Sequence, residues 1–243
     1  MKVLVIGDSC KDIFVYGSIS RLSPEAPVPV IVPTHQKENP GMAANVAANL
    51  SSLGADVDLI TNEKQIKKIR FVDERYNHMV LRVDEGDECE RIKNFNIDYS
   101  KYSSVIISDY CKGFLKTADI INISKNSSCP VFLDTKKYLG SWCEYVDFIK
   151  INNFEYENNK QKIKDNPSLL SKTIITQGKN GCVYRDKRFL TQEVPVKDVS
   201  GAGDTFISGL VVKYIETGDI EQSIMFAQEC TTVVVQKTGV ATV

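Results

Sequence analysis

The sequence is poor in several features that mark familiar classes of protein. It has only two histidines, His35 and His78, so a histidine-rich metal site is excluded and a histidine-based catalytic triad is not expected. Its 30 basic and 31 acidic residues leave no positive surplus to attract nucleic acid. The seven cysteines are odd in number and form no CxxC pair, which disfavours a disulfide framework and a zinc ribbon. We therefore expect small buried thiols in a reducing compartment.

Long apolar runs and the two common nucleotide-binding motifs are also missing. The first apolar run, Val3–Ile6, is followed at once by Gly7 and is too short for a signal-peptide core or a membrane span. We expect a cytoplasmic protein with no membrane or nucleic-acid partner. No GxxxxGK[ST] occurs, and Phe206 replaces the last glycine of a GxGxxG pattern, so neither a P-loop nor a dinucleotide-binding Rossmann site is indicated.

What the sequence does contain is an alternation of short apolar strands with amphipathic helices. Over 243 residues this alternation predicts a single α/β domain with a mostly parallel sheet. The clearest strands are continuous apolar runs, as expected where both faces of a sheet are buried. They span 3–6, 104–108, 131–133 and 173–176, and the expected helices span 43–53, 202–214 and 221–236.

Two segments depart from this alternation. Residues 13–33 carry prolines at 24, 27, 29 and 33, which forbid a helix and suit an edge strand. Residues 66–83 alternate loosely, as a hairpin does. The two segments form either a small β lobe that projects from the main sheet or plain surface loops, and the pattern alone does not decide between them.

The sharpest local signal is the segment DVSGAGDTF at 198–206. Its Gly-Ala-Gly turn opens a helix, where free N–H groups and the helix dipole attract an anion such as phosphate. Asp204 lies in the first turn, placed to take a proton from a hydroxyl that faces this anion. The alternative is that Asp204 simply caps the helix.

The segment DVSGAGDTF resembles the C-terminal signature of the ribokinase-like (PfkB) carbohydrate kinases, and further motifs of that family occur in its order. GDSCKD at 7–12 resembles the first strand and sugar-binding turn, and NPGMAANVAANLSSLGA at 39–55 the glycine-rich signature. NNFE at 152–155 resembles the NxxE motif, and TQGKNG at 176–181 the nucleotide-binding turn. The resemblance covers almost the whole chain. It implies a three-layer α/β fold with a mostly parallel central sheet and a small β lid.

Four further segments resemble one subfamily, the heptose-7-phosphate kinase half of bifunctional kinase–adenylyltransferases. They are RLSPEAPVPV at 21–30, LRVD at 81–84, SDYCKGFL at 108–115 and VVVQKTGVATV at 233–243. The resemblance implies transfer of the γ-phosphoryl group of ATP, with Mg²⁺, to O1 of D-glycero-β-D-manno-heptose 7-phosphate. The runner-up within this class is a kinase for another sugar or sugar phosphate.

The resemblance also implies a role for each matching residue, and phosphoryl transfer asks these residues mainly for positioning and charge stabilisation. Asp204 is the implied general base, and the hole for the transferred phosphoryl group is formed by the N–H groups of Gly201, Ala202, Gly203 and Asp204. The residues implied at the sugar are Asp8, Asp12, Gly41 and Asn45, with Lys112 at its 7-phosphate. Those implied at the nucleotide are Asp134, Lys136, Thr176, Gly178, Gly181, Lys237 and Gly239. Mg²⁺ is expected to be organised, through water, by Asn152 and Glu155.

Several of these residues have a second interpretation. Asn152 and Glu155 are alternatively a helix-capping pair. Asn45 alternatively bonds its own helix, and Lys112 is alternatively a solvated surface lysine. The basic residues Lys67, Lys68 and Arg70 either help to hold the substrate phosphate or form a charged strand face.

The chain departs from the family pattern at three places. Met42 stands where the family has a second glycine, and it is expected to narrow the sugar pocket or restrict the hinge of the lid. After Thr61 only residues 62–65 precede the hairpin-like segment, so a helix-and-strand block is missing and a new edge strand is expected. The chain ends at Val243 without the helix that usually closes the fold. We expect a single-function, compacted kinase, with a separate adenylyltransferase as a candidate partner.

A second hypothesis, that of a non-catalytic binding protein, remains open beside the kinase. In it, the chain is a degenerate family member that binds nucleotide or sugar phosphate without turnover, and the missing block motivates it. The retained Asp204 on its Gly-Ala-Gly turn favours the kinase. The PVPV segment at 27–30 resembles lid strands that pair with a second subunit, so a homodimer through the lid is expected.

Overall fold

Continuous apolar runs build the larger of two sheets, because its strands are covered on both faces. The computed structural model describes residues 1–243 and orders this eight-stranded sheet β12-β11-β10-β9-β8-β7-β1-β4. The six strands β10, β9, β8, β7, β1 and β4 run parallel, whereas β11 is antiparallel to β10 and β12 is antiparallel to β11. Their bounds are β1 Lys2–Gly7, β4 Asp56–Ile60, β7 Ser104–Asp109, β8 Val131–Thr135, β9 Phe148–Asn152, β10 Thr173–Thr176, β11 Cys182–Tyr184 and β12 Lys187–Phe189. The predicted α/β fold with a mostly parallel sheet is confirmed.

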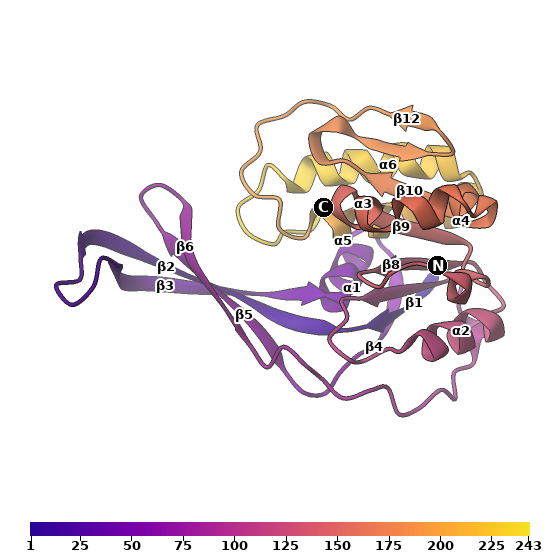
Figure 1. The fold of residues 1–243 in the computed structure, drawn as a ribbon, viewed down its shortest axis with the longest axis horizontal. Coiled ribbons are helices and arrows are strands. Elements are labelled where there is room, and N and C mark those ends of the chain that lie inside the picture. Colours follow the sequence, from indigo (N-terminus) through magenta and orange to yellow (C-terminus); the bar gives the residue numbers. More distant parts are fainter.

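Helices cover both faces of this sheet and divide the core in two (Figure 1). In β1, Leu4 and Ile6 face one half of the core, whereas Val3 and Val5 face the other. The first half is closed by α2 (Thr117–Asn126), α3 (Asn153–Lys164) and α4 (Pro167–Lys172). The second is closed by α1 (Ala43–Ser52), α5 (Ala202–Thr217) and α6 (Ile220–Val234). None of the helices is both long enough and apolar enough to cross a membrane.

The three predicted helices form close to their expected limits. The helix α5 ends at Thr217, three residues beyond the expected Tyr214. The next residue, Gly218, has a φ of 69°, the left-handed conformation in which helices often terminate. The helix α6 ends at Val234, two residues before the expected limit.

The second sheet has four strands in the order β3-β2-β5-β6 and projects from one side of the body (Figure 1). Its strands are β2 (Ser9–Leu22), β3 (Pro29–Met42), β5 (Ile66–Asp73) and β6 (His78–Glu85). Pro29, Pro33 and Pro40 all lie in β3, an edge strand, where a missing N–H breaks no ladder inside the sheet. We call these four strands the small sheet.

The strand β4 ends the large sheet, and a short connection leads from it straight into β5. The expected new edge is therefore present, and Asp56 and Asp58 place charges on it, which discourages pairing with another chain. In the connection, the side chain of Asn62 accepts from Ser9 N–H at 2.7 Å and donates to Ser9 C=O at 3.1 Å. This amide satisfies the start of β2 much as a neighbouring strand would.

Candidate active site

Polar side chains gather at the carboxyl ends of the parallel strands, where open α/β sheets bind their ligands. Asp109 ends β7, Asp134 lies near the end of β8, Asn152 ends β9 and Thr176 ends β10. Because these strands are neighbours in one parallel order, their ends share one edge of the sheet. The N-terminus of α5, with Asp204 in its first turn, is the helix end that meets this edge.

Asp204 is a buried carboxylate of this edge. Its side chain is 3% exposed and accepts one hydrogen bond at each oxygen, from Asn45 Nδ2 at 2.8 Å and from Tyr110 Oη at 2.7 Å. Burial raises the pKa of Asp204 to about 6, although both hydrogen bonds act in the opposite direction. Asp204 is therefore a buried base that is ionised at neutral pH and loses its charge slightly below it.

The turn before Asp204 leaves backbone donors free. Gly201 has a φ of 80°, and a Cβ there would come within 2.7 Å of Asn45 Nδ2, so only glycine fits. The N–H groups of Gly203 and Asp204 have no backbone or side-chain acceptor, as is usual in the first turn of a helix. Of the four N–H groups predicted to form the anion hole, that of Ala202 is already used, because it donates to Val199 C=O at 3.2 Å. The role of the others in catalysis stays a prediction.

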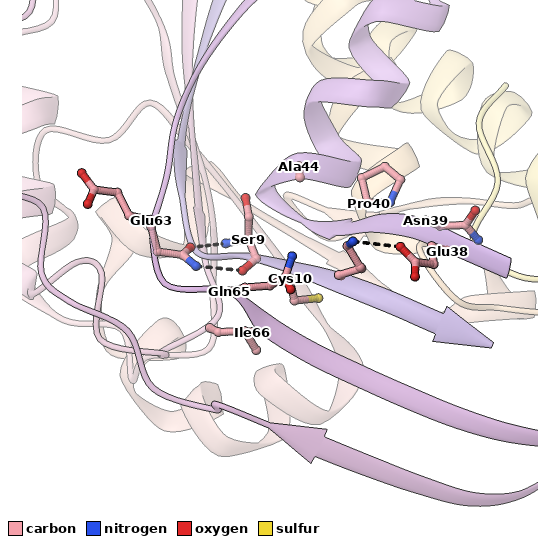
Figure 2. Close-up of a pocket in the computed structure, with 11 residues that line it drawn as sticks. Ser9, Cys10, Glu38, Asn39, Pro40, Ala44, Glu63, Gln65 and Ile66 are labelled. Carbon is pink, nitrogen blue, oxygen red and sulfur yellow. Dashed lines mark hydrogen bonds and ion pairs between the residues drawn. The ribbon is translucent and has the colours of Figure 1, made fainter. Parts of the chain in front are cut away.

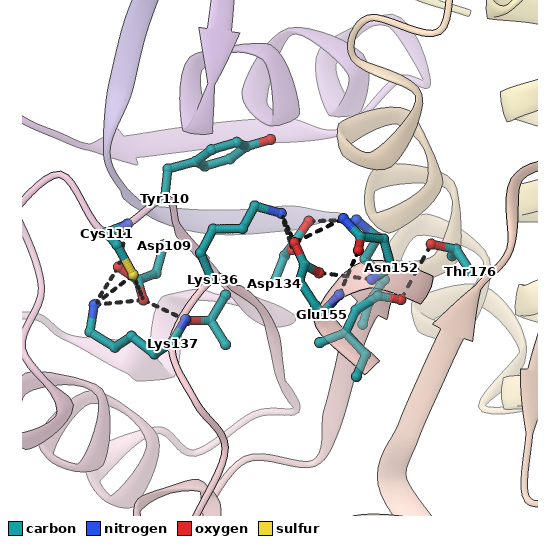
Figure 3. Close-up of polar contacts among 12 residues, drawn as sticks. Asp109, Tyr110, Cys111, Asp134, Lys136, Lys137, Asn152, Glu155 and Thr176 are labelled. Carbon is teal, nitrogen blue, oxygen red and sulfur yellow. Dashed lines mark hydrogen bonds and ion pairs between the residues drawn. The ribbon is translucent and has the colours of Figure 1, made fainter. Parts of the chain in front are cut away.

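Two lysine–carboxylate pairs lie beside this turn. Lys136 Nζ bonds Glu155 Oε1, and Lys150 Nζ lies 2.7 Å from Asp134 Oδ2. Figure 3 shows Lys136 reaching toward Asp134, Asn152 and Glu155, apart from the cluster of Asp109, Cys111 and Lys137. Burial raises the pKa of Asp134, but Lys150 and Lys136 outweigh it and hold that pKa below its usual value. Asp134 Oδ1 is buried without a hydrogen bond.

Asn152 and Glu155 form the capping box of α3. Asn152 Oδ1 accepts from Glu155 N–H at 2.9 Å, and Glu155 Oε2 accepts from Asn152 N–H at 2.8 Å. The capping interpretation of this pair is therefore correct. It does not exclude a second role, because Glu155 also faces Lys136 at the strand ends.

The residues expected at the sugar divide into two groups. Asn45 contacts Asp204 directly, and its Oδ1 also accepts from Asn49 of its own helix. Asp12 is paired with Arg70 across the small sheet, and a Cβ at Gly41 would come within 2.2 Å of Asp12 Oδ2. Asp12 and Gly41 thus lie together at the base of the small sheet, whereas Asn45 lies at Asp204.

Asp8 is engaged in the turn after β7. It is completely buried, and its oxygens accept from the N–H groups of Tyr110 at 2.6 Å and Phe114 at 3.2 Å. In this conformation Asp8 fixes the turn after β7 and has no free oxygen facing a pocket. Its predicted contact with a sugar finds no support in its surroundings.

Met42 has the backbone conformation of a glycine. Its φ is 60° and its ψ is −132°, a region that side chains adopt at a cost of about 1–3 kcal/mol. The side chain is 2% exposed and packs with Cys10 and Ile66, next to Cys89 and Tyr110. Met42 thus fills the joint between the small sheet and the turn that carries Tyr110.

Basic side chains of the small sheet approach the same turn. Lys68 is 9% exposed, has no carboxylate within ion-pair distance and lies 5.3 Å above the ring of Tyr110. Burial lowers its pKa, and the charges of Arg82 and Lys112 lower it further. Lys112 is paired with Asp87 and is mostly covered, so it is not a solvated surface lysine. Lys67 differs, because its side chain lies on the opposite face of the small sheet and pairs with Glu85 at 3.6 Å.

A hollow of about 110 Å³ opens beside the turn before Asp204. Its lining includes Thr176, Gly178, Gly181, Ala202 and Gly203, five residues predicted at the nucleotide or the transferred phosphoryl group. A second hollow, of about 510 Å³, lies along α6, and the two hollows have lining residues in common.

Lys237 and Gly239 line neither of these hollows. Lys237 Nζ bonds the C=O of Thr242, and Gly239 N–H donates to Asp198 Oδ2 at 3.1 Å. Their surroundings therefore do not support the predicted contact with the adenine.

Another hollow, of about 440 Å³, lies at the base of the small sheet beside the connection that replaces the missing block. Figure 2 shows Ser9, Glu38 and Ile66 among its walls. Lys11 pairs with Glu38 at 2.8 Å, and Ser9 N–H donates to Asn62 at 2.7 Å. It contains neither Asp204 nor the turn before it, so it is separate from the candidate active site.

Two residues of the site were not foreseen from the sequence. Tyr110 donates a hydrogen bond to Asp204. Lys150 lies next to the turn before Asp204, since a Cβ built on Gly203 would come within 2.7 Å of Lys150 Nζ. A signal for Lys150 was available, because a lysine inside the apolar run FIKIN is unusual for a buried strand. Tyr110 carried no such signal, since tyrosine is common in cores.

Comparison with known proteins extends these observations. The family described as pfkB family carbohydrate kinase matches residues 63–243. The Bifunctional protein HldE of Bradyrhizobium diazoefficiens is 30% identical over 301 positions, which take up 99% of this chain and 60% of that protein. The chain thus spans about 60% of the length of this relative. Because the alignment is 301 positions long and the chain has 243 residues, at least 58 positions of the relative have no counterpart here.

Solved structures share the fold at low sequence identity. Ribokinase from Thermotoga maritima superposes with a TM-score of 0.73 at 16% identity, covering 98% of this chain and 94% of that one. Arabidopsis thaliana ribokinase complexed with ribose and ATP superposes with a TM-score of 0.67 at 15% identity, covering 98% and 93%. The ribokinase-like fold implied by the sequence motifs is confirmed.

Proposed function

Because this chain belongs to the pfkB family of carbohydrate kinases, we propose that it transfers the γ-phosphoryl group of ATP to a sugar phosphate. The proposed acceptor is O1 of D-glycero-β-D-manno-heptose 7-phosphate, as the subfamily segments suggest. The observation that carries the proposal is Asp204, a buried base held by Asn45 and Tyr110 directly after a turn with free N–H groups.

The proposed chemistry assigns each step to a residue of the chain. Asp204 takes the proton of the attacking hydroxyl, and its pKa of about 6 suits a base at neutral pH. The free N–H groups of Gly203 and Asp204 hold the charge that develops on the transferred phosphoryl group. Asp204 Oδ1 already accepts from Tyr110 Oη, so the acceptor hydroxyl would use a further lone pair of this carboxylate beside Tyr110.

The carboxylates near the turn fit a hydrated Mg²⁺ carried by ATP. Asp134 and Glu155 supply only oxygen donors, and Asp134 Oδ1 is buried without a hydrogen bond. No cluster of three His, Cys, Asp or Glu residues forms a metal cage, so most ligands would come from phosphate and water. When bound, Mg²⁺ neutralises charge on the phosphate oxygens.

The basic side chains of the small sheet support a phosphorylated substrate over a free sugar. Lys68 is buried without an anion beside Tyr110, and Arg82 and Lys112 add positive charge close to it. Burying a lysine without a partner is costly, and a phosphate on the far end of the sugar would remove that cost. In this proposal Lys112 and Lys68 hold the 7-phosphate.

The outer face of the small sheet supports a homodimer. Register places Ile13, Ile69 and Val83 side by side on three strands, and likewise Val15, Phe71 and Leu81. Leu81 is 55% exposed and Val83 36% exposed. Two copies of such an apolar ladder cover one another in a two-fold dimer.

The test is ADP release with ATP and Mg²⁺ over a panel of heptose 7-phosphate, related sugar phosphates and free sugars. We expect one sugar phosphate to stimulate release and Asp204→Asn to reduce it by about 10²-fold or more. If no sugar stimulates turnover although ATP binds, a nucleotide-binding protein without catalysis is the better description.

A further inference from the structure

Lys150 is a buried cation whose one partner does not use all its hydrogen-bond donors. It lies on β9 and is 4% exposed. Its only hydrogen bond is to Asp134 Oδ2 at 2.7 Å. An ammonium group has three donors, so two remain unused in a place that the chain keeps from bulk water.

The ammonium lies against the first turn of α5. A Cβ built on Gly203 would be 2.7 Å from Lys150 Nζ, so the ammonium occupies the space in front of that residue. The N–H groups of Gly203 and Asp204 lie in the same turn and have no acceptor. The ammonium, held on one side by Asp134, thus lies against a helix turn that has two N–H groups without an acceptor.

Asp134 provides a second, independent sign of a missing ligand. One of its oxygens is held by Lys150, but Oδ1 is buried without a hydrogen bond. Lys136 lies 3.8 Å from that oxygen and is bonded to Glu155 instead. The pair of Lys150 and Asp134 is thus a half-satisfied polar group, which is costly in a folded core unless a ligand completes it.

We propose that Lys150 binds the phosphoryl group in transfer, donating to an oxygen of the ATP γ-phosphate and, after reaction, to the same group on the product. This inference rests on the proposed function. It makes Lys150 a catalytic residue that contacts the reacting group, distinct from Lys136, which is bonded to Glu155. Asp134 is then a positioning residue that holds the ammonium beneath Gly203.

The test compares nucleotides that differ only at the γ-phosphate. Binding of ADP and of a non-hydrolysable ATP analogue, each with Mg²⁺, is measured by calorimetry for the wild type, Lys150→Gln and Lys150→Met. Glutamine keeps a hydrogen bond to Asp134 without the charge, so it guards against a variant that fails to fold. Lys172→Met is the matched control, because Lys172 is also buried but bonds the C=O groups of Cys143, Glu144 and Val146 away from the site.

We expect the Lys150 variants to bind the analogue at least tenfold more weakly while ADP affinity changes less than threefold, and kcat to fall about 10²-fold. Lys172→Met should lower thermal stability but keep the preference for the analogue. Equal weakening of ADP and analogue, or an unchanged kcat in a folded Lys150→Gln, would overturn the inference alone. A wild type that binds neither nucleotide would instead overturn the proposed function and the inference with it.

Discussion

Asp204 and Tyr110 show how a single hydrogen bond tunes the candidate base. Tyr110 Oη donates to Asp204 Oδ1 and thereby favours the charged carboxylate, while burial favours the neutral form and wins. The resulting pKa of about 6 lies within the range where enzymes are assayed. A base with this pKa works when deprotonated, so activity is lost as the pH falls through 6.

This sets the expected pH dependence of kcat/KM, which reports the free enzyme. The wild type should lose half its activity near pH 6. Tyr110→Phe removes a bond that lowers the pKa of Asp204, so its acid limb should lie at higher pH. The matched control is Tyr102→Phe, since Tyr102 Oη donates to Asp58 at 2.7 Å on the sheet edge. An acid limb that stays in place or moves down in Tyr110→Phe would contradict the assigned role of this bond.

Met42 offers a second prediction at the scale of one residue. Its backbone conformation costs about 1–3 kcal/mol with any side chain, whereas its buried side chain contributes about 1.5–3 kcal/mol. Met42→Ala loses the burial and keeps the strain, but Met42→Gly also relieves the strain. Urea unfolding should therefore rank Met42→Gly above Met42→Ala in stability.

The control is a helical position, where the alanine variant should be more stable than the glycine variant. Leu50 is completely buried in α1, and there glycine should be less stable than alanine by about 1 kcal/mol. If Met42→Gly is also less stable than Met42→Ala, the strain at this position has been overestimated.

At the scale of elements, the small sheet has two unlike faces. One face carries Asp12, Lys68 and Arg70 toward the body, and the other carries the apolar ladder of Ile13, Ile69 and Val83 with its neighbours. A strand alternates its side chains between the faces, so in the proposed function one face of each strand would meet the substrate and the other the second subunit. The connection between β4 and β5 is bonded through Asn62 to the start of β2 although the expected block is absent.

The proposed dimer predicts the effect of one charge on the ladder. Leu81→Asp places a carboxylate in the apolar face and should convert the dimer to a monomer in sedimentation experiments. Leu190→Asp is the control, because Leu190 is 77% exposed in the segment after β12, outside the small sheet. A wild type that sediments as a monomer at high concentration would remove the dimer, and a dimeric Leu81→Asp would place its interface elsewhere.

At the scale of the whole molecule, two small apolar clusters contribute to joining the projecting sheet to the body. One contains Cys10, Met42 and Ile66, and the other contains Phe14, Tyr16 and Val72, packed against Val240. Because little apolar surface is buried here, we expect the small sheet to be held to the body less firmly than the strands of the large sheet are held to one another.

Hydrogen exchange with Asp204→Asn, which holds ligands without turnover, tests how each ligand acts on the two parts. The sugar phosphate should slow exchange in β5 and β6, which carry Lys68 and Arg82. ATP should slow exchange around 176–181 and 200–206, beside the hollow near Gly203. Unchanged exchange in the small sheet with sugar phosphate would show that its basic residues do not hold the substrate.

The sequence by itself determined the α/β layers, the helix that begins within DVSGAGDTF, and the short connection that makes β4 an edge strand. These features follow from periodicity, from glycine at a turn and from a motif order, all of which are local along the chain. The confirmed family also follows from such local segments. Local patterns are readable because each depends only on neighbouring residues.

Only the tertiary structure decided which groups meet at Asp204. Tyr110 follows β7 and Lys150 lies within β9, and the contact between Asn45 and Asp204 spans 159 positions in the chain. The same is true of Asp8, whose oxygens are taken by a turn more than 100 residues away. Whether a polar side chain is free for a ligand depends on which distant donors pack against it, and no spacing along the chain records that.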